Sequence, residues 1–127
     1  RGADLTKADL SGANLERATM KWSNLHRANL TNANLSRANL RLAKLTRTNL
    51  THAILEETCL HDASMREADL TDALLVDADF RGADIGGWKV TREQLSLAKN
   101  VGTQPSRIEL PQPQNDGTSQ SRDQGNG

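Results

Sequence analysis

A five-residue spacing of large apolar side chains constrains this chain more than any other feature. From Leu5 to Ile85, leucine or a comparable apolar residue stands at every fifth position, seventeen times without a gap. Two positions before each of them is a small residue, which is alanine except at Ser23, Thr48 and Thr58. An internal repeat defines a fold before local propensities do, so any fold proposed for this chain has to satisfy this period.

Neither regular secondary structure accommodates a period of five. On an α-helix, residues five apart are rotated by roughly 140°, so the apolar side chains would spiral around the axis. On a continuous strand they would alternate between the two faces. The small and large residues of one unit are two apart and share a face, so all of them point inward only if the chain turns once per unit. We predict that four turns close a square coil of twenty residues, and that stacked coils form a solenoid with an apolar core.

The individual units resemble a known family. AlaAspLeuThrLys at 3–7, AlaAsnLeuGluArg at 13–17 and AlaAsnLeuSerArg at 33–37 resemble the pentapeptide-repeat pattern of a small residue, Asp or Asn, Leu and two variable residues. The resemblance covers 1–87 and implies an all-β fold, a right-handed quadrilateral β-helix with a turn at each corner. A leucine-rich repeat needs units of about 20–29 residues and does not fit. Six units depart from the pattern at the Asp/Asn position, with Thr19, Lys44, Ile54, Cys59, Ser64 and Leu74.

We predict three segments: a β-helix of about four coils at 1–87, a cap with a short α-helix at 88–102, and a disordered tail at 103–127. Thr91 and Gln94 have the spacing of a capping box, which begins a helix. Terminal units of solenoids need such caps. The tail contains mostly polar residues, with Ile108 and Leu110 as its large apolar ones, which is typical of disorder. The residues that we expect to form the cap are Trp88, Val90, Thr91, Gln94, Leu95 and Ala98.

The net charge of zero conceals an uneven distribution along the chain. Positions 1–50 carry nine basic and three acidic residues, a net of +6, whereas 51–85 carry two and nine, a net of −7. If residues twenty apart stack, two columns change from basic to acidic along the rod. We call these columns the charged ladders. One ladder contains Lys7, Arg27, Arg47 and Glu67; the other contains Arg17, Arg37, Glu57 and Asp77.

Apolar residues interrupt the outward-facing positions at two places. Trp22 and Leu42 are predicted to stack on one face, and Ile54 and Leu74 on another, beside Val76. Stacked surface apolar residues form a patch, and patches of this kind mark interaction sites. We therefore expect these five residues to be candidate contacts for another protein or for a second copy of the chain.

The sequence offers no catalytic constellation, and we predict neither an enzyme nor a cofactor. A rod filled with leucine is expected to have no cavity for a substrate. His26, His52 and His61 are predicted to lie on three different faces, and Cys59 with His61 supplies too few ligands for a metal. The single cysteine forms no internal disulfide and suits a reducing compartment, so we predict a cytoplasmic protein.

The sequence therefore predicts a non-catalytic scaffold for protein–protein interaction, either by itself or as a module of a larger protein. The family resemblance also implies an alternative, because some members protect gyrase by imitating DNA. A DNA-like rod of about 20 Å needs roughly twelve net negative charges, whereas the repeats carry eleven basic and twelve acidic residues, so mimicry is disfavoured. Binding of nucleic acid by the basic half is a second alternative, disfavoured by the low aromatic content.

Overall fold

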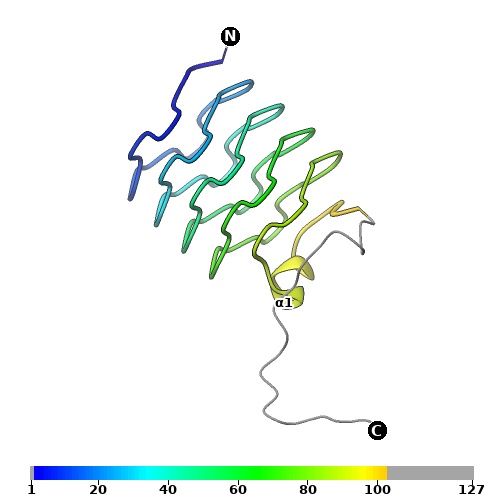
Figure 1. The fold of residues 1–127 in the computed structure, drawn as a ribbon. Coiled ribbons are helices and arrows are strands. Elements are labelled where there is room, and N and C mark those ends of the chain that lie inside the picture. Colours follow the sequence, from blue (N-terminus) through cyan, green and yellow to red (C-terminus); the bar gives the residue numbers. More distant parts are fainter. Residues whose placement is uncertain (1, 103–127) are drawn as a thin grey trace, which may run out of the picture.

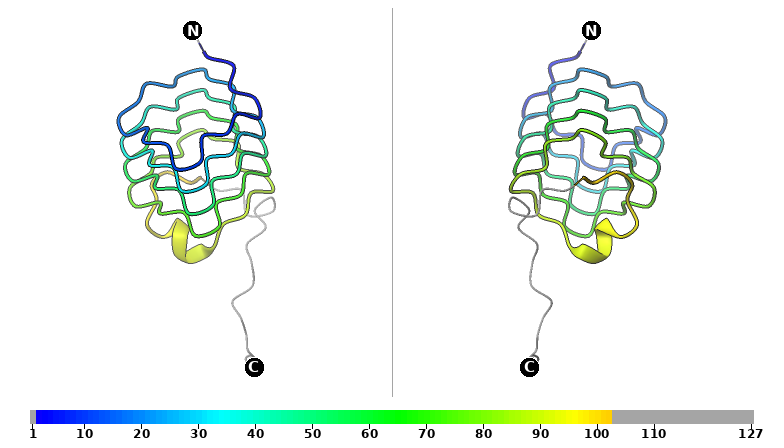
Figure 2. Two further views of the ribbon diagram at one scale, coloured as in Figure 1. Left: turned by 90° about the vertical axis from the view of Figure 1, so that its left-hand side faces the viewer. Right: turned by 90° about the vertical axis from the view of Figure 1, so that its right-hand side faces the viewer.

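The structure is a computed structural model that describes residues 2–102, and the predicted tail lies outside the described residues. Its coils stack on one another along a single axis, as the views in Figures 1 and 2 show. Isolated parallel β-bridges join residues twenty apart, from Asp4 with Asn24 to Asp79 with Lys99. The predicted twenty-residue coil and the β-helix fold are therefore confirmed. Apart from these bridges, the described residues contain one helix, α1, at Arg92–Leu95.

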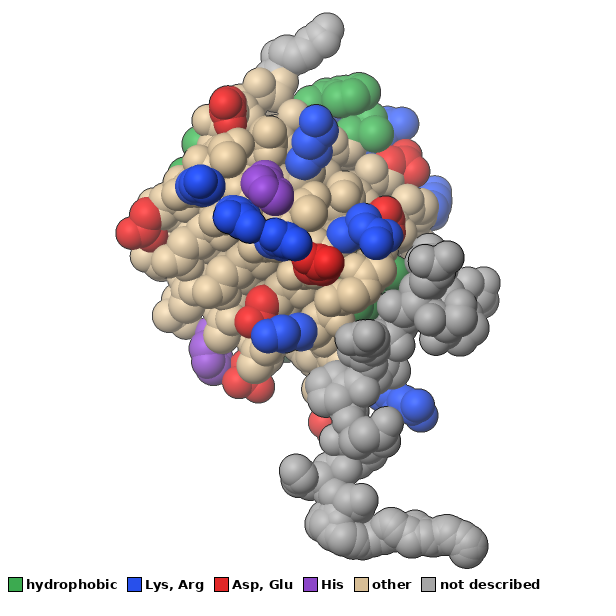
Figure 3. All heavy atoms as spheres, in the orientation of Figure 1, with side chains coloured by type: hydrophobic (Ala, Val, Ile, Leu, Met, Phe, Trp, Pro, Cys, Tyr) green, Lys and Arg blue, Asp and Glu red, His purple; other side chains and the backbone are tan. Residues whose placement is uncertain are grey.

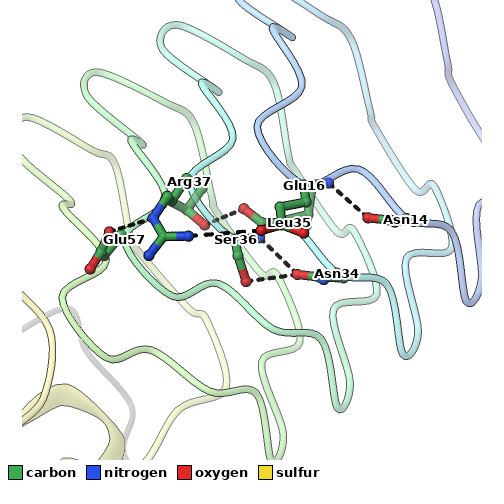
Figure 4. Close-up of polar contacts among 8 residues, drawn as sticks. Asn14, Glu16, Asn34, Leu35, Ser36, Arg37 and Glu57 are labelled. Atoms are coloured by element: carbon green, nitrogen blue, oxygen red, sulfur yellow. Dashed lines mark hydrogen bonds and ion pairs between the residues drawn. The ribbon is translucent and has the colours of Figure 1, made fainter.

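Every backbone N–H in a typical unit has a partner, as residues 33–37 illustrate. The N–H of Ala33 closes a turn onto the Leu30 carbonyl, and that of Asn34 binds the preceding coil. The N–H groups of Leu35 and Arg37 bind carbonyls of the following coil at 2.7 and 2.8 Å. The fifth N–H, that of Ser36, donates to the side chain of Asn34 at 3.0 Å (Figure 4). The five-residue unit is thus the smallest piece of chain whose repetition gives every backbone N–H a partner, either within the turn or in a neighbouring coil.

The side-chain acceptor explains why Asp or Asn recurs at the second position of the unit. In all eleven units with Asp or Asn there, the Oδ1 atom accepts the N–H two residues later. This local bond is the Asx turn that makes both residues common at turns. The six departures at this position, all within residues 2–102, have no Oδ1 atom, and no side-chain bond to the N–H two residues later is present at them.

Each corner is a β-turn whose third residue has a positive φ. This residue has φ between 56° and 71° in all seventeen units, although only Gly12, Gly82 and Gly87 are glycines. A positive φ at the third residue alone is the signature of a type II turn. A left-handed conformation costs a non-glycine residue about 1–2 kcal/mol, so the fourteen other corners are held in place by bonds between coils.

The core is a column of leucines, and they are fully buried from Leu25 onward. Leu5, Leu10 and Leu15 in the first described coil are only partly buried. The two threonines at alanine positions are also fully buried, and their hydroxyls donate to carbonyls of an earlier coil: Thr48 to Leu25 and Thr58 to Leu35, both at 2.7 Å. A buried hydroxyl is tolerated only when it is bonded in this way.

The cap differs from the expectation that the repeat ends at Gly87. Lys89 pairs with Asp69 and Lys99 pairs with Asp79, so a fifth coil forms in part, with α1 in place of one of its corners. Trp88 and Val90 occupy the small and large core positions of this coil and are buried. Trp88 packs edge-on against Phe80, with ring centroids 5.1 Å apart. The cap therefore continues the coil register beyond Gly87.

Candidate protein-contact surfaces

Trp22 and Leu42 lie at one corner in successive coils. The N–H of Trp22 donates to the Arg41 carbonyl at 3.0 Å, which fixes the two corners one above the other. Trp22 is 55% exposed and Leu42 is partly buried. Beside them is an open groove of about 530 Å³, lined by Gly2, Trp22, Leu42, Ala43, Lys44, Asp62 and Ser64. The sequence predicted the two apolar residues, but its expectation of a rod without a concave site overlooked this groove on the outer surface.

Three basic residues lie at this groove, together with the acid Asp62 that lines it. Lys44 lines it, and Lys21 and Arg41 directly precede the two apolar corner residues; all three are exposed. Within residues 2–102 none of these three forms an ion pair. Figure 3 shows one face of the rod, on which basic side chains lie with acidic ones among them. We call Trp22, Leu42, Lys21, Arg41 and Lys44 the Trp22 surface.

A second apolar surface lies near the C-terminal end of the rod. Ile54 and Leu74 form a parallel bridge and are 36% and 43% exposed. Leu97, which is 50% exposed, follows on the adjacent corner, because its carbonyl accepts the N–H of Asp77 at 2.8 Å. We call Ile54, Leu74, Val76 and Leu97, with the neighbouring acids Glu56, Glu57 and Asp77, the Leu74 surface.

The sequence analysis missed Leu97 because it ended the repeat at Gly87. Leu97 lies twenty residues after Asp77, so extending the register by one coil would have placed it in the ladder column of Arg17, Arg37 and Glu57. The C-terminal apolar surface is therefore larger than the sequence indicated, because it includes Leu97 in addition to Ile54, Leu74 and Val76.

The charged ladders contain ion pairs where their sign changes. Arg37 bonds Glu57 at 2.9 Å and lies 3.8 Å from Glu16 (Figure 4). In the other ladder, Arg47 bonds Glu67 at 2.6 Å, and this hydrogen bond, with the nearby positive charge, lowers the pKa of Glu67. These side chains are about half exposed, and exposed pairs contribute at most about 1 kcal/mol each. The ladders therefore shape the surface potential more than they stabilise the fold.

Asp79 joins the third and fourth coils to the cap. Its carboxylate accepts hydrogen bonds from Asn100 at 2.9 Å and from the backbone of Arg81 at 3.1 Å, and it lies 2.7 Å from the His61 ring. Burial acts to raise the pKa of Asp79, but the bonds from Asn100 and His61 outweigh it and hold the pKa at about 2. The group is therefore ionised throughout the neutral range and serves as a fixed acceptor.

The candidate chemical groups do not converge. His52 faces Asp72 at 3.7 Å and His61 faces Asp79, while the thiol of Cys59 is free and partly buried. Across residues 2–102, no three side chains of His, Cys, Asp or Glu form a group that could hold a metal ion. The only helix in this part of the chain, α1, is too short to cross a membrane. What the geometry does offer is two apolar surfaces on a hydrogen-bonded rod.

Comparison with known proteins agrees with this geometry. The model of pentapeptide repeats matches residues 1–21, 23–62 and 63–85, in eight copies. A pentapeptide repeat protein from the cyanobacterium Cyanothece 51142 superposes with a TM-score of 0.61 at 20% identity, covering 77% of this chain and 84% of that one. A pentapeptide repeat protein from Nostoc Pcc 7120 is 29% identical with a TM-score of 0.36, covering 87% and 86%. A search of curated proteins found no match.

Proposed function

Because this chain belongs to the pentapeptide-repeat family, we propose that it is a non-catalytic scaffold that binds another protein through its outer surface. The observation that carries the proposal is the exposure of Trp22, Ile54, Leu74 and Leu97, the four large apolar side chains that residues 2–102 leave open to solvent. Ile54, Leu74 and Leu97 lie close together, and Trp22 lies beside the partly buried Leu42. Grouped apolar residues of this kind mark interaction sites.

The rod is suited to binding because its surface is held in position before a partner arrives. Trp22 and Leu42 are both anchored by backbone bonds to the next coil, at 3.0 and 2.9 Å. A surface that is ordered in the free protein loses little conformational entropy on binding, which improves affinity without additional contacts. A large aromatic side chain at the centre of such a surface is the commonest binding hot spot.

The charges favour this proposal over imitation of DNA. A DNA mimic needs an uninterrupted acidic surface, but in both ladders acidic residues neutralise basic ones: Arg37 bonds Glu57, and Arg47 bonds Glu67. The basic half carries Trp22 as its one exposed aromatic residue among the described positions. Stacking of nucleotide bases requires more aromatic surface than this.

The proposal is tested by affinity capture from an extract of the source organism. Four forms of the full chain are immobilised: wild type, Trp22→Ser/Leu42→Ser, Ile54→Ser/Leu74→Ser, and the corner control Asn32→Ser/His52→Ser. Each must keep the wild-type circular dichroism spectrum. We expect a protein that wild type and control retain and that one of the two apolar variants loses. Equal recovery by all four forms would show that neither surface is the binding site.

A further inference from the structure

One wall of the rod carries five cations and no acid over two successive coils. This wall extends from the corner of Trp22 to the corner of Arg27, and residues 21–27 and 41–47 form it in the second and third coils. Its cations are exposed: Lys21, Arg27, Arg41, Lys44 and Arg47. Arg47 bonds Glu67, whereas the other four form no ion pair within residues 2–102. We call residues 21–27 and 41–47 the basic wall.

Backbone bonds hold the two coils of the basic wall in register. The N–H of Leu25 donates to the Lys44 carbonyl at 2.7 Å, and that of Arg27 donates to the Thr46 carbonyl at 3.0 Å. Neighbouring coils are spaced like β-strands, so the two coils together cover about 10 Å of the rod axis. The cations therefore form a fixed array, and a single extended peptide that crosses the wall can contact both coils at once.

The edge of the basic wall at Trp22 is apolar. Trp22 is 55% exposed, and together with the partly buried Leu42 it lines the open groove of about 530 Å³. Lys44 also lines this groove, and Asp62 lines it from the next coil. Covering Trp22 removes apolar area from water, the main favourable term in association. The groove therefore suits an apolar residue of a partner, while Asp62 disfavours a carboxylate at this end.

We propose that the basic wall binds an extended acidic segment of a partner protein, with one apolar residue of that segment in the groove beside Trp22. This inference rests on the proposed function and specifies the chemistry of the partner. From the groove, the segment passes Lys44 and reaches the corner of Arg27 and Arg47. Lys44 follows Leu42 by two residues and Arg47 follows it by five. An extended segment alongside needs carboxylates about two and about four or five residues from its apolar residue.

The small extent of the basic wall favours a peptide over a membrane or a nucleic acid. The same wall carries Asp4 in the coil before it, and Asp62 and Glu67 in the coil after it. A bilayer, or a nucleic acid strand that follows the rod, would meet these carboxylates, whereas a segment that crosses the wall meets the cations. The carboxylate of Asp4 also accepts the hydroxyl and the N–H of Thr6 at 2.7 and 3.1 Å, which keeps it in its own turn.

Two synthetic peptides of Gly and Ser, each with a fluorescent label, test the proposal on the full chain. The acidic peptide carries a leucine followed by glutamates two and four positions later, which matches the extended spacing. The control peptide carries glutamines in place of the glutamates. Fluorescence anisotropy measures both affinities. We expect the control peptide to bind roughly fivefold more weakly, and added salt to weaken only the acidic peptide, because salt screens charge.

NMR spectroscopy locates the binding site, because the chain has two tryptophans and therefore two indole N–H signals. Trp22 is exposed at the groove, whereas Trp88 is fully buried at the other end of the rod. The acidic peptide should shift the Trp22 signal and leave the Trp88 signal in place. A shift of neither signal on peptide binding, or of Trp88 alone, would contradict the proposal.

Matched variants separate the basic wall from the overall charge. Arg27→Ser/Lys44→Ser and the control Arg17→Ser/Arg92→Ser each remove two positive charges, and the control residues lie outside the basic wall and form no ion pair within residues 2–102. Both must keep the wild-type circular dichroism spectrum. We expect the first to bind the acidic peptide about tenfold more weakly than the control does. Equal loss in the two variants would refute a site at the wall.

The remaining outcomes identify other occupants or overturn the proposal. Single-stranded DNA and vesicles rich in phosphatidylserine are measured alongside the peptides, and tighter binding of either would make the partner a nucleic acid or a membrane. Growth of the free chain with concentration in light scattering, lost in Arg27→Ser/Lys44→Ser, would make it a second copy. If no peptide binds but a captured protein is lost by Trp22→Ser/Leu42→Ser, the acidic partner is wrong and the scaffold function stands. If capture is also equal for all forms, both proposals fail.

Discussion

Replacing Gln94 by Glu should destabilise the C-terminal end of the rod, although a glutamate at this position is compatible with the capping box. Gln94 uses both ends of its amide. Its Oε1 atom accepts the N–H of Thr91 at 2.8 Å, which is the capping-box bond of α1. Its Nε2 atom donates to the carbonyls of Leu70 and Ala73 at 2.7 and 2.9 Å. Glutamate keeps the first interaction and loses both donations.

The size of the effect follows from the two carbonyls. Both belong to the fourth coil beneath α1. Gln94 gives the Ala73 carbonyl the donor that the backbone of another full coil would supply, whereas the Leu70 carbonyl also accepts the N–H of Ala73 at 2.9 Å. A part-buried hydrogen bond contributes about 0.5–1.5 kcal/mol, and an acceptor left without a donor costs more. The new carboxylate would also face two carbonyl oxygens. We therefore expect Gln94→Glu to lower the free energy of unfolding by about 2–4 kcal/mol, and the melting temperature by roughly 10–20 °C.

Urea denaturation followed by circular dichroism measures this loss. Thr91→Ala removes only the capping hydroxyl and should cost about 1 kcal/mol, so it separates helix capping from carbonyl satisfaction. Because the folded state should raise the pKa of the new carboxyl above its unfolded value, the difference from wild type should shrink as the pH falls from 7 towards about 4 and stay constant below that. The reasoning is refuted if Gln94→Glu is as stable as wild type at pH 7, or no less stable than Thr91→Ala.

Three further predictions follow from single sites. Thr58→Val keeps the shape of a buried side chain but removes its bond to the Leu35 carbonyl, and we expect a loss of about 1 kcal/mol in urea denaturation; an unchanged midpoint would contradict this. The pKa of Asp79 is depressed to about 2, so the stability that its carboxylate contributes is complete above about pH 4 and is lost as the pH falls through 2. Asp79→Asn should therefore be less stable than wild type by about 1–2 kcal/mol at pH 6. Thermal unfolding should show that this difference narrows at pH 2. Arg17 has a φ of 62°, so Arg17→Gly should be neutral or stabilise the fold by up to about 1 kcal/mol. Glu16→Gly, at a position where φ is not positive, should destabilise the fold by about 0.5–1 kcal/mol. If Glu16→Gly were the more stable of the two variants, the corners would not be strained.

The sequence predicted the coil because every structural requirement of the coil repeats within five residues. The turn, the Asx acceptor and the pair of inward side chains are all local, and seventeen units repeat them with few departures. The period therefore fixed the register of the columns, including the ladder pairs Arg37–Glu57 and Arg47–Glu67. The capping box of Thr91 and Gln94 was also visible, since it too is a local pattern.

The five-residue period does not predict side-chain contacts between residues that belong to different columns. His61 reaches Asp79 eighteen residues away, and Gln94 reaches Leu70 across twenty-four, because side-chain direction and the detour of α1 decide which atoms meet. The partial fifth coil and the exposed position of Leu97 depend on backbone pairing that continues after the sequence pattern has ended. The same holds for the groove beside Trp22, whose walls come from four coils.

The sequence by itself therefore determined the architecture, the buried column and the segregation of charge along the rod. The tertiary structure alone decided that a groove lies beside Trp22, that Leu97 adjoins the surface of Ile54 and Leu74, and that a single amide at Gln94 closes the stack. The physical reason is that every unit repeats the same pattern of backbone hydrogen bonds, whereas the shape of a surface depends on side chains from several coils at once.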